Sequence, residues 1–237
     1  MRLSVRRRQP ELMDDPALDR ATHQQALAGL RRVNWWSRTD SVIWNALKTV
    51  QPKATGEPLR ILDVGSGGGD LLCRLAGRFA GHEIPAVFTG WDISLDAVQY
   101  ATEQARIAGV KNVSFEVHDC LNETFPEQKF DVVMCSLFLH HLDEHDAVSL
   151  LNGMRLAASQ LVLVDDLVRS KFGYWLAWAG CRILTRCRIV HIDGPLSVEG
   201  AFTTAEALKI ADYARLSPCR ITRHWPQRFL LQWSRAN

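Results

Sequence analysis

The residues best suited to bind a ligand lie in one stretch, where an apolar run meets two carboxylates and the alternate glycines Gly65, Gly67 and Gly69. The stretch reads Ile61-Leu62-Asp63-Val64-Gly65-Ser66-Gly67-Gly68-Gly69-Asp70. Such glycines allow a tight turn and leave backbone N–H groups facing a ligand at the start of a helix. Asp92 ends the next apolar run, where a carboxylate can accept both hydroxyl protons of a ribose. The pattern indicates a nucleoside ligand with a charged tail.

The two carboxylates of the loop decide the sign of that charge. A dinucleotide fingerprint needs a small residue where this chain has Asp70, and Asp63 would repel a nearby pyrophosphate. A ligand with an ammonium group and a sulfonium centre reverses the interaction, so the loop favours S-adenosylmethionine over NAD. The alternative role for Asp63 is to hydrogen-bond the loop amides only. Hydride transfer is the rival reaction, and both carboxylates argue against it.

The elements that must position this loop follow from the pattern of apolar residues. Short apolar runs alternate with helical stretches from residue 60 onward. The runs expected to be strands are Ile61–Val64, Ala86–Trp91, Val113–Val117, Val132–Met134 and Leu161–Val164. Strand and helix alternation of this kind predicts an α/β fold with a parallel sheet covered by helices on both faces.

The two ends of the chain carry further helices. Residues 12–50 show helical spacing, with Asp40 as the expected cap of a second helix. Thr203 and Glu206 form a capping box for a helix through Ala214. The final residues, 219–225 and 229–233, are expected to form a hairpin.

Four motifs in this order resemble the class I S-adenosylmethionine-dependent methyltransferases over about residues 58–167. They are Asp63-x-Gly65-x-Gly67-x-Gly69, Asp92, Val117-His118-Asp119, and Phe130-Asp131-Val132-Val133-x-x-Ser136-x-x-x-His140-His141-Leu142. The resemblance implies a Rossmann-like, seven-stranded, mostly parallel sheet whose last strand is antiparallel. Within the family, the chain is most similar to small-molecule enzymes of the quinone and polyketide type. Cys135-Ser136-Leu137-Phe138 replaces the loop typical of nucleic-acid base methyltransferases.

The resemblance also implies roles for individual residues around S-adenosylmethionine. Gly65, Ser66 and Gly67 would line the methionine end, Asp92 and Ile93 the ribose, Asp119 and Cys120 the adenine, and Ser136 the loop beside the sulfonium. Asp119 is suited to accept a hydrogen bond from the adenine amino group. Arg38, at the end of the N-terminal helices, is a candidate partner of the methionine carboxylate, with a plain surface role as the alternative.

Histidines are the candidate general bases. His140 and His141 follow the fourth strand, and adjacent residues on a helical turn point about 100° apart, so one of them is expected to face the pocket. His191 follows an apolar and basic segment that the core fold does not require. Asp165 and Asp166, which end the fifth strand, are candidates to anchor a base or the acceptor hydroxyl. For each histidine the alternative is a capping or packing role.

The segment 172–190 is apolar on nearly every face and then becomes basic. Such a helix must be buried or must contact lipid or a partner. Three interpretations remain open, namely a wall of the acceptor pocket, a peripheral anchor on anionic membranes, and a dimer contact. The first is favoured, because an insert after the fifth strand lies above the cleft in this fold.

Composition sets the remaining limits. The chain has 237 residues, 47% of them hydrophobic, and a formal charge of +2, which leaves no electrostatic footprint for nucleic acid. Arg6, Arg7 and Arg8 are expected to form a solvated arm. The six cysteines lack the spacing of a zinc site, so we expect no metal and reduced thiols in the cytoplasm. No secretory signal or membrane span is apparent.

These observations together predict a single methyltransferase domain over residues 1–237. Its parts would be a helical lid at 1–57, a cofactor-binding core at 58–167, a helical insert at 168–202, and a C-terminal helix and hairpin at 203–237. The expected reaction is O-methylation of a hydrophobic aromatic or lipid-like small molecule by a monomer or homodimer. C-methylation of a quinone-type ring is the alternative. A catalytically idle protein that binds a partner through Trp175 and Trp178 is the other alternative.

Overall fold

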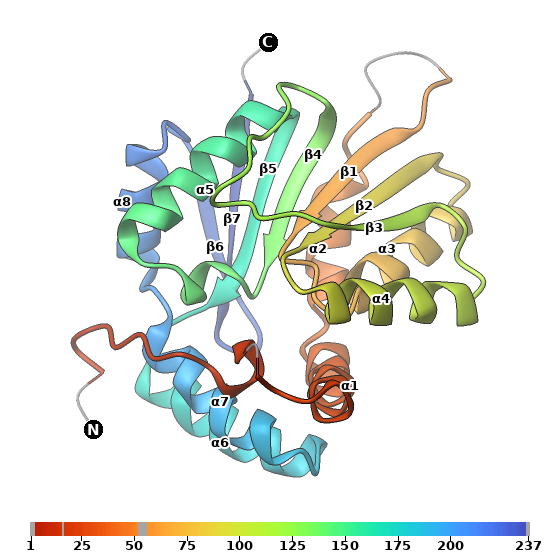
Figure 1. The fold of residues 1–237 in the computed structure, drawn as a ribbon. Coiled ribbons are helices and arrows are strands. Elements are labelled where there is room, and N and C mark those ends of the chain that lie inside the picture. Colours follow the sequence, from red (N-terminus) through yellow and green to blue (C-terminus); the bar gives the residue numbers. More distant parts are fainter. Residues whose placement is uncertain (1–2, 16, 52–55, 236–237) are drawn as a thin grey trace.

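The computed structural model describes residues 3–15, 17–51 and 56–235, and its centre is a seven-stranded sheet in the order β3-β2-β1-β4-β5-β7-β6 (Figure 1). The strands are β1 Leu59–Val64, β2 Ala86–Asp92, β3 Val113–Val117, β4 Phe130–Ser136, β5 Ala158–Leu167, β6 Arg220–His224 and β7 Arg228–Ser234. Strands β1 to β5 pair in parallel, whereas β7 is antiparallel to both β5 and β6. The expected sheet, including its antiparallel last strand and the hairpin, is confirmed.

Helices and two short 3-10 turns connect and cover the strands. They are η1 Leu12–Asp14, α1 Arg20–Ser37, α2 Thr39–Leu47, α3 Asp70–Gly81, α4 Leu95–Ile107, η2 Leu139–His141, α5 Glu144–Ala157, α6 Lys171–Leu184, α7 Arg188–Gly200 and α8 Thr204–Tyr213. The capping box of α8 forms as expected between Thr203 and Glu206. None of the helices in the described ranges combines the length and the apolar character needed to cross a bilayer.

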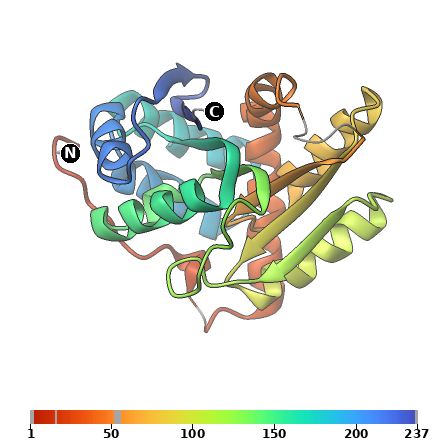
Figure 2. The same ribbon diagram turned by 90° about the horizontal axis from the view of Figure 1, so that it is seen from above.

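Alternation along the strands gives the sheet a core on each face. In β4, Val132 and Met134 pack against α2 and α3, whereas Val133 and Cys135 pack toward α5 and α8. Successive strand side chains point to opposite faces, so an unbroken apolar run is what a sheet covered on both sides requires. Figure 2 shows α5 and α8 side by side at one end of the molecule, with α4 at the other.

The segments outside the sheet and its covering helices lie beyond the carboxyl ends of the parallel strands. There α6 and α7 lie next to each other, with α1 beside them, and the N-terminal segment runs across α7 before it enters α1 (Figure 1). Ligands of open α/β sheets bind at this end. The N-terminal extension and the insert therefore enclose the region that the glycine loop faces.

Two expectations for the N-terminal part are wrong. Arg6 is not part of a solvated arm, because its guanidinium donates to the carbonyls of Gly200, His140 and Leu142 at 2.6, 3.0 and 2.6 Å. Asp40 does not cap a helix, because α2 begins at Thr39 and the Asp40 carboxylate accepts two hydrogen bonds from the Arg78 guanidinium instead. Both interactions are with residues distant in sequence, and such contacts cannot be predicted from local sequence patterns.

Candidate active site

A cavity of about 830 Å³ lies between the carboxyl ends of the strands and the segments that cover them. Its floor is the glycine loop with Asp92 and Ile93, and its polar side carries Glu11, Asp14, His140 and His141. Its apolar side consists of residues from two helices, Leu27, Leu30 and Val33 of α1 and Leu176, Ala177, Gly180 and Leu184 of α6. The insert thus forms one wall of the cavity, and the helical lid forms another.

The glycine loop adopts the backbone that its sequence predicts. Gly65, Gly67 and Gly69 have φ values of 70°, 51° and 70°, which side chains rarely tolerate. A Cβ atom at Gly65 would also lie 2.6 Å from the ring of Phe138. Asp92 fixes the loop to the end of β2, because its carboxylate accepts hydrogen bonds from the backbone N–H groups of Gly67 and Ser94 at 2.8 and 2.9 Å. Each carboxylate oxygen of Asp92 keeps a lone pair for a ligand in the cavity that it lines.

Asp63, beneath the loop, has no ion-pair partner among the described residues, whereas Asp70 pairs with Arg74 at 3.1 Å. Asp63 is almost fully buried, and its Oδ1 has no hydrogen-bond partner among the described residues. Burial, and then the charges of Asp70 and Asp92, raise the pKa of Asp63 well above its ordinary value. Burial likewise raises the pKa of Asp92. A cationic group in the cavity would offset this repulsion, so the loop fits a ligand that carries an ammonium and a sulfonium.

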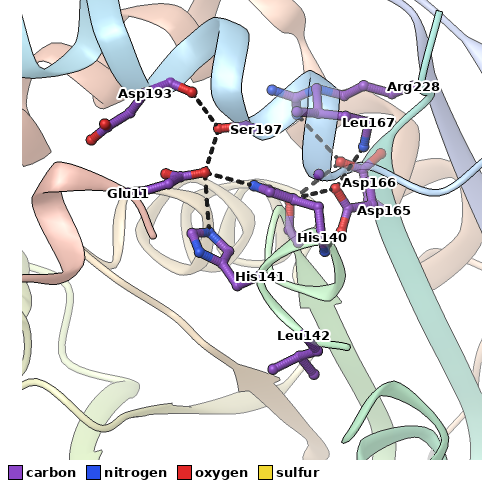
Figure 3. Close-up of polar contacts among 12 residues, drawn as sticks. Glu11, His140, His141, Leu142, Asp165, Asp166, Leu167, Asp193, Ser197 and Arg228 are labelled. Atoms are coloured by element: carbon purple, nitrogen blue, oxygen red, sulfur yellow. Dashed lines mark hydrogen bonds and ion pairs between the residues drawn. The ribbon is translucent and has the colours of Figure 1, made fainter. Parts of the chain in front are cut away.

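The turn after β4 places His140 in a buried ion pair. Its Nδ1 atom lies 2.7 Å from Oδ1 of Asp166, and its Nε2 atom lies 3.5 Å from Oε1 of Glu11 (Figure 3). Burial lowers the pKa of His140, but the charges and hydrogen bonds of Asp166 and Glu11 outweigh it and raise that pKa to about 10. His140 is therefore a cation at neutral pH, and a protonated imidazole cannot act as a base.

His141 has a different environment. Its Nδ1 atom lies 2.9 Å from Oδ2 of Asp14, and its Nε2 atom lies 4.0 Å from Oε1 of Glu11. The ring is partly exposed, whereas that of His140 is buried. Both histidines line the cavity and their ring centroids are 4.3 Å apart, so the expectation that one of them faces the pocket is wrong. A carboxylate on Nδ1 fixes the tautomer that leaves a lone pair on Nε2. His141 thus has the arrangement of a general base.

Glu11 is the centre of this polar group. Its Oε1 accepts a hydrogen bond of 2.6 Å from Ser197 and faces the Nε2 atoms of both histidines (Figure 3). Glu11, His140 and His141 are close enough to ligate one ion. Protonated His140 supplies a positive charge between Glu11 and Asp166. The hydrogen bonds with His140, after the opposing effect of burial, lower the pKa of Glu11 and keep it ionised.

A second polar group supports the loop beside the expected sulfonium position. Ser136 lines the cavity and donates to Oδ2 of Asp165 at 3.3 Å. Asp165 is buried and also pairs with His224 and Arg228, at 2.6 and 3.3 Å. Ser136 thus lies at the cavity, whereas Asp165 is bound within the protein and does not line the cavity.

Several expected site residues are placed elsewhere. Asp119 and Cys120 do not line the cavity, and the carboxylate of Asp119 accepts hydrogen bonds from Leu121 and from the backbone and side chain of Asn122. Arg38 is exposed where α1 ends in a left-handed turn. The ring of His191 binds the carbonyl of Thr185 at 2.7 Å. None of these side chains is brought to the cavity that holds Asp92 and His141.

Sequence reasoning missed three residues that complete the polar side of the cavity. Glu11 and Asp14 come from the segment before α1, and Ser197 comes from α7. Asp193 holds the first two in place, because its carboxylate accepts the backbone N–H groups of Leu12 and Met13 at 2.9 and 3.1 Å. The cluster of acidic residues at 11–15, directly before a helix, is the signal that could have drawn attention to this segment.

Comparisons with known proteins bear on this geometry. Residues 56–169 match the model of a methyltransferase domain family. Phosphoethanolamine N-methyltransferase 1 of Arabidopsis thaliana is 32% identical over 113 residues, which are 47% of this chain and 21% of that protein. The chain thus matches about a fifth of the length of that relative.

Solved structures extend the likeness to nearly the whole fold. An O-methyltransferase family 2 protein from Planctomyces limnophilus, in complex with apigenin, aligns with a TM-score of 0.64 at 15% identity, over 94% of this chain and 63% of that one. Magnesium protoporphyrin IX methyltransferase from Synechocystis, with bound S-adenosylhomocysteine, aligns with a TM-score of 0.58 at 17% identity, over 94% and 91%. Residues 56–169 therefore match a methyltransferase domain, and the strand order and glycine loop already described give the chain the fold of the class I S-adenosylmethionine-dependent methyltransferases.

Proposed function

We propose that this chain transfers the methyl group of S-adenosylmethionine to a hydroxyl group of a hydrophobic small molecule. The observation that carries the proposal is the continuity of one cavity, which runs from Asp92 and the glycine loop past His141 to the apolar faces of α1 and α6. Donor, base and acceptor would then share one enclosed space. Aligning two reactants and excluding water is the larger part of catalysis in a displacement with a good leaving group.

The donor side follows from the carboxylates. The sulfonium of S-adenosylmethionine supplies a methyl group on a good leaving group. Asp92 would accept the ribose hydroxyl protons, and a cationic methionine end would offset the effects that raise the pKa of Asp63 and so favour its ionised form. Ser136, at the end of β4, lines the same cavity as the glycine loop.

The class of acceptor is inferred from His141, the candidate base, and from the apolar wall of the cavity. Asp14 orients His141 so that Nε2 can take the proton of a hydroxyl, which raises the nucleophilicity of the oxygen as the methyl group is transferred. The cation at His140 lies beside it and favours the negative charge that develops on that oxygen. Leu27, Leu176 and Leu184 offer apolar surface to the remainder of the acceptor.

The charges of the cavity argue against a phosphate-bearing acceptor such as phosphoethanolamine, which the Arabidopsis relative is named for. Among the described residues that line the cavity, Arg228 is the one arginine or lysine. Its guanidinium is buried against Asp165 and Thr39, so its charge is already matched. The positive charge of His140 lies between Asp166 and Glu11, so it too is already matched. A phosphate would meet the carboxylates of Glu11 and Asp14, which repel it.

The test is a methyltransfer assay with S-adenosylmethionine and a panel of phenols that differ in the length of an alkyl chain. We expect turnover that increases with chain length and is inhibited by S-adenosylhomocysteine. Methylation of phosphoethanolamine or of short polar amines, with none of the phenols, would contradict the proposal. Binding of S-adenosylhomocysteine without turnover of any acceptor would favour the catalytically idle alternative.

A further inference from the structure

The outer face of α6 exposes more aromatic surface than a solvated helix needs. Phe172, Trp175 and Trp178 are 60%, 62% and 40% exposed, and they recur every three residues on one side of the helix. The rings of Trp175 and Trp178 contact each other at a centroid distance of 5.9 Å. Figure 1 shows α6 as the outermost helix at the carboxyl end of the sheet. We call Phe172, Trp175 and Trp178 the α6 aromatic face.

Other aromatic side chains continue this face across neighbouring elements. The turn between β6 and β7 touches the start of α6, where Ser170 donates to the Gln227 side chain at 3.1 Å. Trp225, two residues before Gln227, is 51% exposed and contacts the ring of Trp36 at 5.2 Å. The exposed aromatic rings therefore come from α6, the β6–β7 turn and the end of α1.

The segment that carries the aromatic face has charged residues of one sign only. The stretch from Lys171 to Ile192 contains no aspartate or glutamate and carries Arg182, Arg186 and Arg188, all exposed. Arg182 lies over the ring of Trp178, with 4.4 Å from its Cζ to the ring centroid. The neighbouring stretch 21–38 of α1 also lacks acidic residues. In a chain with a formal charge of only +2, basic residues are thus concentrated where the aromatic rings are exposed.

We propose that the α6 aromatic face, with Trp225 and the surrounding arginines, docks on a membrane surface that contains anionic lipids. Tryptophan rings suit the depth of the lipid head groups, and arginines beside them pair with anionic phosphates. A helix that lies in the interface buries its apolar face and keeps its cationic residues at head-group level. A second copy of this chain fits less well, because two identical arginine-rich faces would repel each other.

The inner face of the same helix lines the cavity, so docking would also bring the cavity close to the membrane. Leu176, Ala177, Gly180 and Leu184 line the cavity from the side opposite the aromatic face. A helix with its side chains is about 10 Å across, so docking holds the cavity within that distance of the lipid surface. This consequence rests on the proposed hydrophobic acceptor, whereas the docking itself does not.

The experiment is flotation of the full chain with vesicles of phosphatidylcholine alone and of phosphatidylcholine with phosphatidylglycerol. We expect flotation with the anionic vesicles, weaker flotation with the neutral ones, and loss at high salt. The variant F172S/W175S should weaken binding at least about tenfold, since it removes two exposed apolar groups. The variant R182Q/R186Q should weaken binding to anionic vesicles by a similar factor and leave neutral vesicles unaffected.

The matched control is I107S/Y213S, because Ile107 of α4 and Tyr213 of α8 are 65% and 62% exposed at other sites. This control should float as the unaltered chain does. Absence of flotation with anionic vesicles, or equal losses in F172S/W175S and the control, overturns the proposal. A shift between dimer and monomer in F172S/W175S, without any vesicle binding, would assign the face to self-association instead. Calorimetry with S-adenosylhomocysteine should give the same affinity for all these variants, which separates failed docking from a failed donor site.

Discussion

Asp14 and His141 are 127 residues apart in the chain, and their side chains are hydrogen-bonded at 2.9 Å between Oδ2 and Nδ1. The contact joins the segment before α1 to the turn after β4. That segment is held on its other side by Asp193 of α7, which accepts the N–H groups of Leu12 and Met13. The N-terminal segment therefore contributes side chains to the candidate active site as well as covering it.

Replacement of His141 by alanine should lower kcat about 10²- to 10⁴-fold, the usual contribution of a general base, with a small change in KM. D14N should lower kcat less, because the imidazole remains but loses its orienting partner. H191A is the matched control, since the His191 ring binds the Thr185 carbonyl and should leave kcat within about twofold. Equal losses in H141A and H191A, measured at saturating acceptor, would refute the assignment.

Asp92 is the carboxylate on which donor binding should depend most. D92A removes the acceptor of the Gly67 and Ser94 N–H groups and of the ribose hydroxyls. Each such charge-assisted bond contributes about 1.5–3 kcal/mol, so we expect affinity for S-adenosylhomocysteine to fall at least about tenfold. Calorimetry is the measurement, with E103Q as the control, because Glu103 pairs with Arg106 on the exposed side of α4. Unchanged affinity in D92A would show that the donor binds elsewhere.

The pair of His140 and Asp166 makes stability depend on pH. The pKa of His140 is about 10 in the folded chain, against about 6.5 for an unperturbed histidine. A raised pKa stabilises the fold fully below pH 6.5, and the contribution is lost as pH rises toward 10. Denaturant titrations should show stability falling over this window.

Two variants separate the His140 effect from general alkaline destabilisation. H140Q should be less stable than the unaltered chain at about pH 6.5 and show a flatter decline toward pH 10. E11Q keeps the imidazole but removes one of its two carboxylates, so the folded-state pKa of His140 falls and the decline should be smaller and end at a lower pH. Parallel pH curves for the unaltered chain and both variants would contradict the ion pair.

Arg6 ties the N-terminal segment to the turn that carries the histidines. Its guanidinium donates to three carbonyls and lies over the Phe202 ring, with 3.6 Å from Cζ to the ring centroid. R6A should lower the free energy of unfolding by about 2–4 kcal/mol. The neighbouring R7A is the control, because the Arg7 side chain is exposed. Equal melting temperatures for R6A and R7A would show that the contacts of Arg6 add nothing.

The sheet could be predicted from the sequence because its signals are local. Ile61, Val132 and Leu161 begin apolar runs whose length and spacing suit buried parallel strands, and all three lie in the strands of the sheet. The glycine loop and Asp92 were recognisable for the same reason. The backbone needs glycine where φ is positive, as at Gly65 and Gly67, and a ribose-binding carboxylate belongs at the end of a strand. Both features can be recognised from a few neighbouring residues.

The polar side of the cavity could not be predicted because its contacts join distant segments. Nothing near Glu11 in the sequence indicates Ser197 or His140 as a partner, and nothing near Arg6 indicates the carbonyl of Gly200. Arg38 was expected at the donor site from its position before the core. A left-handed residue at the end of α1 directs the chain into α2 there, and the Arg38 side chain is exposed.

The most direct test of the account is to follow a trideuteromethyl group from labelled S-adenosylmethionine into a long-chain phenol. Mass spectrometry would report the transfer, and NMR would report the atom that receives the label. We predict a label on oxygen, formed by the unaltered chain and reduced at least about 100-fold in H141A. A label on a ring carbon, or undiminished labelling in H141A, would contradict the claim that His141 activates an acceptor hydroxyl in this cavity.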